Sequence, residues 1–123
     1  MRRAGQSLRL LVVENEPLIA MFIEHVAQGQ GWQIVGPALN LGQALELADT
    51  AFDGAVLDIH LEGGERSLPV AARLRQRGIP FMFATALDSP AERFGFEDSS
   101  VLLKPFGHQE FVTSVRTHLT AEG

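Results

Sequence analysis

Five short apolar runs recur along this 123-residue chain, and each is followed by a segment whose apolar residues keep helical spacing. A continuous apolar run is typical of a strand buried on both faces of a parallel sheet. Repeated strand–helix units with short connections predict one α/β domain, a doubly wound (βα)5 fold with helices on both faces of a parallel five-stranded sheet. The runs are Leu8–Val13, Trp32–Gly36, Ala55–Ile59, Phe81–Ala84 and Val101–Leu103.

The first three helices carry start and stop signals. Pro17 stands where the first helix begins, because its fixed φ suits a first turn, and the glycines at Gly29–Gly31 end that helix. Asn40 can cap the second helix through its side-chain oxygen. Pro69 opens the third helix, which is expected to stop at Gly78.

The last two helical segments differ from each other. Residues 88–99 are mostly small or polar, with Phe94 and Phe96 as the apolar anchors, so we expect a short or irregular fourth helix. The final helix keeps apolar residues at helical spacing from Phe111 to Leu119.

Composition restricts the function. The net charge of −5 disfavours binding to nucleic acid, and the absence of cysteine excludes disulfides and thiolate metal sites. No apolar run approaches the roughly 18 residues of a membrane span, and no signal peptide is visible, so a cytoplasmic protein without membrane contact is predicted. One domain over 8–120 is expected, between a flexible N-terminal segment at 1–7 and a tail at 121–123.

Polar side chains stand at four of the five predicted strand ends. Glu14 and Asn15 follow the first strand. Asp58 closes the third, Thr85 follows the fourth, and Lys104 follows the fifth. Each residue alone is more often a helix cap, a loop anchor or a solvated side chain. Because doubly wound sheets bind ligands outside the carboxyl ends of their strands, the five together predict a functional cleft.

Phosphoryl transfer to a carboxylate is the chemistry that needs this set. Asp58 can attack phosphorus and form a mixed anhydride. A divalent cation must neutralise the phosphoryl oxygens, and the hard oxygen atoms of Glu14, Asn15 and Asp58 suit Mg²⁺. A lysine ammonium and a threonine hydroxyl can hold the remaining oxygens, so such a site acts by positioning and charge stabilisation.

The chain resembles the receiver domains of two-component response regulators over essentially its whole length. The segments that carry the resemblance are LLVVENEP, LDIHL, FATA and LKPF, in this order and at the predicted strand ends. The resemblance implies a flavodoxin-like sheet of order 2-1-3-4-5. It also implies a signalling domain with at most self-phosphorylation and self-dephosphorylation activity. The implied partners are a histidine kinase or histidine phosphotransfer protein as donor, and a downstream protein.

The same resemblance gives the acidic residues their roles. It makes Asp58 the phosphoacceptor and places Glu14 and Asn15 on the acidic pair that binds Mg²⁺. The backbone carbonyl of His60 corresponds to the third protein ligand of the metal. Asn15 stands where the family usually has Asp, so the site keeps a donor oxygen but loses a charge, and weakened Mg²⁺ binding is predicted.

Thr85 and Lys104 also correspond to family positions. Thr85 matches the hydroxyl that follows the phosphoryl group, and Lys104 matches the lysine that precedes a cis proline, here Pro105. The phrase GIPFMFAT and the nineteen-residue step from Thr85 to Lys104 look like the FAT-GUY receivers of alphaproteobacterial stress signalling. The Gly-hydrophobic-Tyr continuation of that subgroup is replaced here by Ala86-Leu87-Asp88.

The usual aromatic residue three positions before the lysine is missing. That position is Val101, and the chain contains no Tyr, so a rotating aromatic cannot relay the signal. The response to phosphorylation is therefore expected in Ala86–Ser99, a segment predicted to have few buried apolar contacts, and on the last helix around His108–Thr117. The alternative is a receiver-like interaction module that no longer depends on phosphorylation, a possibility that Asn15 and Val101 leave open.

Enzymes of similar fold are less well supported. A haloacid-dehalogenase-type phosphatase needs a second Asp where this chain has His60. An FMN site needs phosphate-binding donors in the first turn, where Glu14-Asn15-Glu16 would repel a phosphate. The other histidines lack the spacing of a metal site and are expected at the surface: His25, His108 and His118.

Overall fold

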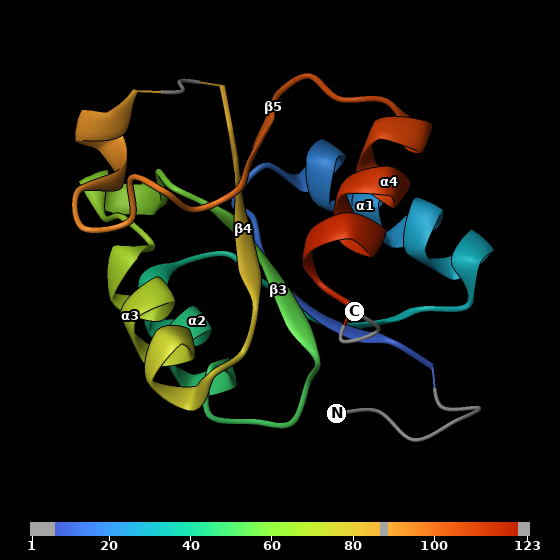
Figure 1. The fold of residues 1–123 in the computed structure, drawn as a ribbon, viewed down its shortest axis with the longest axis horizontal. Helices are drawn as coiled ribbons and strands as arrows, with labels where there is room; N and C mark the ends of the chain where they lie inside the picture. Colours follow the sequence, from blue (N-terminus) through green and yellow to red (C-terminus); the bar gives the residue numbers. More distant parts are fainter. Residues whose placement is uncertain (1–6, 87–88, 121–123) are drawn as a thin grey trace.

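The computed structural model describes residues 7–86 and 89–120 and contains a five-stranded parallel sheet of order β2-β1-β3-β4-β5 (Figure 1). The predicted doubly wound fold and strand order are confirmed. The segments predicted to be a flexible N-terminus and a tail lie outside the described residues, except for Ser7. The strands are β1 (Arg9–Val13), β2 (Gln33–Ala38), β3 (Gly54–Asp58), β4 (Phe81–Thr85) and β5 (Val101–Leu103).

Helices cover both faces of the sheet (Figure 1). One face carries α1 (Pro17–Gln30) and α4 (His108–His118), and the other carries α2 (Leu41–Leu47) and α3 (Leu68–Arg77). Successive strand side chains alternate between the two apolar layers, because adjacent residues of a strand point to opposite faces. Among the described residues, no helix is long and apolar enough to cross a membrane.

The predicted helix signals operate as expected. Pro17 opens α1, which ends at Gly31 with a left-handed φ of 78°. The side-chain oxygen of Asn40 accepts a hydrogen bond from the Gln43 amide at 2.9 Å and so caps α2. Gly78 ends α3 in the same left-handed conformation as Gly31.

The predicted end of the second strand is wrong. The predicted strand ended at Gly36, whereas β2 continues through a cis Gly36–Pro37 bond to Ala38. A Cβ atom at Gly36 would lie 2.8 Å from the Ala38 nitrogen and 2.9 Å from the Val12 oxygen. Only glycine fits there, and the edge position of β2 tolerates the proline.

In the described part of the segment between β4 and β5, residue 86 and residues 89–100, the one helical element is a short 3₁₀ turn, η2 (Pro90–Arg93), as the sequence predicted. Phe96 is 8% exposed, and its ring packs edge-on against Phe81 and Phe83. The anchor role predicted for Phe96 is therefore confirmed. The anchor role predicted for Phe94 is wrong, because its side chain is 78% exposed. Gly95 lies between them with a φ of 88°, so the two rings do not share a face.

Phe96→Ala should destabilise the domain by about 3–5 kcal/mol, because it removes a buried ring that packs against two others. Phe94→Ala is the matched control and should change stability by no more than about 0.5 kcal/mol. Urea denaturation followed by circular dichroism measures both values. Equal effects of the two substitutions would contradict the placement of this segment.

Candidate functional site

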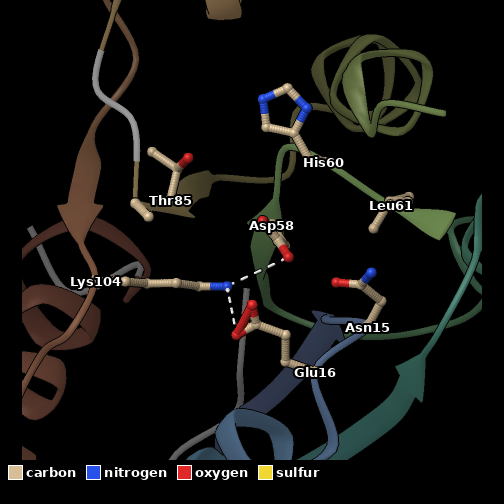
Figure 2. A pocket seen from close by; sticks show the side chains of 8 residues that line it. Asn15, Glu16, Asp58, His60, Leu61, Thr85 and Lys104 are labelled. Carbon is tan, nitrogen blue, oxygen red and sulfur yellow. Dashed lines mark ion pairs between the residues drawn. The ribbon is translucent and has the colours of Figure 1, made fainter. Parts of the chain in front are cut away.

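A cleft of about 250 Å³ opens at the carboxyl ends of the strands (Figure 2). Asn15 follows β1, Asp58 ends β3, Thr85 ends β4 and Lys104 follows β5, so the chain brings together side chains that lie far apart in sequence. Glu14 lies buried beside the cleft with its carboxylate on Lys104. The lining residues are Asn15, Glu16, Asp58, His60, Leu61, Thr85, Ala86 and Lys104.

The ammonium group of Lys104 connects the acidic residues. Its Nζ lies 2.9 Å from Oε1 of Glu14 and donates a hydrogen bond to Oε2 at 3.1 Å. It is also 3.3 Å from Oδ2 of Asp58 and 3.8 Å from Oε2 of Glu16, and Figure 2 shows it between these two carboxylates. The arrangement places one positive charge among three carboxylates.

Backbone hydrogen bonds of the sheet fix the positions of Lys104 and Glu14. The Lys104 amide donates to the Thr85 carbonyl at 2.9 Å, which continues the β4–β5 pairing past the end of β5. The Glu14 amide donates to the Ala38 carbonyl at 2.9 Å at the end of β2. Because the sheet itself holds both residues, the ion pair is a product of strand register.

Burial determines the charge state of the cleft. The Glu14 side chain is 1% exposed, and this burial raises the pKa of Glu14 from 4.5 to about 7. The hydrogen bond from Lys104 lowers it, and the charge of Asp58 raises it further. Burial opposes the charge of Lys104, but the hydrogen bond to Glu14 and the nearby carboxylates outweigh burial and raise the pKa of Lys104 above 10.5.

The residues present fit a hard divalent cation. Oxygen donors come from Glu14, the Asn15 side chain, Asp58 and the main chain at His60, and Mg²⁺ prefers such ligands. Oε1 of Glu14 is buried, and apart from the Lys104 ammonium 2.9 Å away it has no hydrogen-bond partner among the described residues, so a lone pair remains for a metal ion. In the described ranges, no three acidic or histidine side chains are grouped closely enough to hold a metal by themselves. A magnesium site here would therefore depend on the amide of Asn15 and on a backbone carbonyl.

Thr85 is 2% exposed at the end of β4 and lines the cleft with Asp58. Residues 101–103 of β5 carry aliphatic side chains, in agreement with the missing aromatic at Val101. The expected surface positions of His25, His108 and His118 are confirmed.

Glu16 lines the cleft, whereas the sequence predicted for it only a place in a turn that would repel a phosphate. It occupies the N-cap of α1, yet its side chain makes no capping hydrogen bond and lies instead near Lys104. The sequence feature that could have identified Glu16 as a cleft residue is its acidic side chain at the N-cap of the first helix, directly after Glu14 and Asn15. A glutamate is an uncommon N-cap residue, which suggests a use other than capping.

The stability of the metal-free domain should decrease as the pH rises from about 4.5 to about 7. The pKa of Glu14 is higher in the folded than in the unfolded state, so the folded state holds its proton more tightly. The contribution is complete below 4.5 and is lost as the pH passes 7, an effect on the order of 3 kcal/mol. Urea titrations in the presence of a chelator measure it.

Glu14→Gln should remove this part of the pH dependence, whereas the exposed Glu46→Gln should keep it. The same slope for wild type and Glu14→Gln would contradict the assigned cause.

No family model matches the chain. The chain is similar to SdrG from Sphingomonas melonis Fr1, with 38% identity over 89% of this chain and 94% of SdrG and a TM-score of 0.78. A BeF3-activated conformation of SdrG gives a TM-score of 0.72. The receiver domain of sensor histidine kinase PA1611 from Pseudomonas aeruginosa shares the fold, with 19% identity, 93% and 98% coverage and a TM-score of 0.76. That protein has a magnesium ion coordinated in its active-site cleft.

The phyllosphere-induced regulator PhyR of Methylorubrum extorquens is 33% identical over 110 residues, which cover 84% of this chain and 40% of PhyR. The chain spans about half the length of the curated relatives that it matches. Similarity to SdrG over nearly its whole length, together with the match to PhyR, establishes the family. The chain belongs to the receiver domains of two-component response regulators.

Proposed function

We propose that this domain accepts a phosphoryl group on Asp58 from a histidine kinase or a histidine phosphotransfer protein and signals through protein contacts. The observation that carries the proposal is the position of Lys104, whose Nζ lies 3.3 Å from Asp58 and 2.9 Å from Glu14 in a buried cleft. An ammonium so placed is available to the new phosphoryl oxygens when Asp58 loses its own charge.

The side chains divide the transfer between them. A carboxylate oxygen of Asp58 attacks phosphorus, the bond from phosphorus to the donor nitrogen breaks, and the electron pair stays on the donor imidazole. Lys104 and the hydroxyl of Thr85 then hold phosphoryl oxygens, since both residues line the same cleft. Catalysis by the domain is positioning and charge stabilisation, and the domain turns over no separate substrate.

Glu14, Asn15, Asp58 and the main chain at His60 would hold Mg²⁺, which supplies charge neutralisation at the phosphoryl oxygens when bound. Asn15 gives this site one carboxylate fewer than an acidic pair would. Half-occupancy should therefore need a higher Mg²⁺ concentration than in a receiver with two acidic residues.

A protein donor has an apolar surface available directly beside the cleft. A pocket between α1 and the chain after β5 shares Lys104 with the cleft. Leu18 is 79% exposed and Met21 63% exposed on α1 next to it. A partner that covers these side chains would bring its own phosphoryl group to the mouth of the cleft. The pocket is lined by Leu18, Ile19, Phe22, Lys104, Pro105 and Phe106.

Asp58→Asn should abolish phosphorylation and leave the fold intact, because the amide is nearly isosteric but is not a nucleophile. Incubation with Mg²⁺ and acetyl phosphate, followed by intact mass measurement, should show one phosphoryl group on wild type and none on the variant. Asp98→Asn, at an exposed position, is the matched control and should behave as wild type.

If wild type gains no mass under these conditions or with any histidine-phosphorylated donor, the domain is an interaction module independent of phosphate. A mass gain that persists in Asp58→Asn would show that another residue is the acceptor.

Asn15→Asp should tighten Mg²⁺ binding, because it restores a negative charge beside a divalent cation. The gain should be on the order of 1–2 kcal/mol, about five- to thirty-fold in affinity. Isothermal titration calorimetry measures it directly. Equal affinities of wild type and Asn15→Asp would show that residue 15 is not a ligand.

A further inference from the structure

One carboxylate joins the loop after β3 to the segment after β4. Oε2 of Glu92, in η2, lies 3.0 Å from Nε2 of His60 and 3.3 Å from Nη1 of Arg66. The Glu92 side chain is only 19% exposed, although it carries a charge and lies in a short surface turn. The contacts with His60 and Arg66 therefore hold the Glu92 carboxylate in this partly buried position.

The two partners of Glu92 form the base of a small hairpin. His60 and Arg66 pair as an antiparallel bridge, and the Leu61 amide donates to the Glu65 carbonyl at 2.8 Å. A 3₁₀ turn, η1 (Glu62–Gly64), closes the hairpin. By contacting both sides of its base, Glu92 fixes the whole β3–α3 connection against η2.

This hairpin belongs to the functional cleft. His60 lines the cleft two residues after Asp58, and Figure 2 shows its imidazole turned away from the Asp58 carboxylate. The turn that carries Glu92 begins five residues after Thr85. The contact therefore links the loop that follows the phosphoacceptor to the segment that follows the hydroxyl residue.

We propose that Glu92 is a positioning residue, a latch that holds the β3–α3 hairpin against η2 in the unphosphorylated domain and that phosphorylation of Asp58 releases. The inference rests on the proposed function. A phosphoryl group on Asp58 adds negative charge to the cleft that His60 lines, and the His60 imidazole, which points away from Asp58 in the unphosphorylated domain, would leave Glu92 if it turned toward that charge. A contact present in one state only shifts the equilibrium by its own free energy.

Removal of the latch should make the domain easier to activate. In the presence of Mg²⁺, Glu92→Gln should bind beryllofluoride about two- to five-fold more tightly than wild type, the range expected for one partly exposed ion pair. Glu97→Gln removes the same charge from an exposed position in the same segment and should bind as wild type does. Calorimetry gives the affinities, and thermal unfolding gives the stabilities.

A double-mutant cycle with Arg66→Met tests whether the effect passes through the hairpin. The gain of the double variant should be smaller than the product of the two single gains, because both remove one latch. Hydrogen exchange should show residues 89–96 less protected in Glu92→Gln before any ligand is added, and in wild type only with beryllofluoride.

The outcomes separate the latch from the proposed function. If wild type binds beryllofluoride and Glu92→Gln binds with the affinity of Glu97→Gln or more weakly, the latch is overturned while the phosphoacceptor role stands. A loss of stability without a gain in affinity would show a structural contact only and would also overturn the latch. Failure of wild type to bind beryllofluoride would overturn both.

Discussion

The charge balance of the cleft depends on one ammonium group, that of Lys104, beside two buried carboxylates. Glu14 and Asp58 stand side by side at the ends of β1 and β3, where burial and mutual repulsion disfavour two negative charges. Lys104 offsets that repulsion, and it can do so because β5 pairs with β4 in the register that sets its backbone. The same arrangement holds the Lys104 ammonium where a phosphoryl group on Asp58 would need a positive charge. The resting structure and the proposed chemistry therefore use the same charges.

The charge balance of the cleft also explains two unusual residues of the first turn. Asn15 removes a charge that would have added to the repulsion around Glu14, and Glu16 adds one farther out, 3.8 Å from Lys104. The Glu16 side chain is 57% exposed, so its charge costs little to maintain. With Asn15 the cleft carries one negative charge fewer at its centre than an acidic pair would give it.

Much of the fold followed from the sequence because β1, β3 and β4 are buried on both faces and therefore appear as continuous apolar runs. The predicted cleft residues lie together because parallel strands end at one edge. The errors have specific causes. β2 extends past Gly36 because Ala38 pairs with Val13 of β1, a partner that lies far away in the sequence. The left-handed backbone of Gly95 separates the directions of the Phe94 and Phe96 rings, so Phe94 is exposed. The hydrophobicity of residue 94 gives no sign of this exposure. The contact of Glu92 with His60 joins residues 32 positions apart, and no local pattern marks it.

The chain contains a single lysine, so the central interaction can be observed alone. With ¹⁵N-lysine labelling, nuclear magnetic resonance at low temperature should show one side-chain ammonium signal, since Lys104 is 9% exposed and protected by its carboxylates. Addition of Mg²⁺ and beryllofluoride should move that signal in wild type and leave it unmoved in Asp58→Asn. A signal that does not respond in wild type, while calorimetry shows beryllofluoride bound, would contradict the assignment of Lys104 to the phosphoryl site.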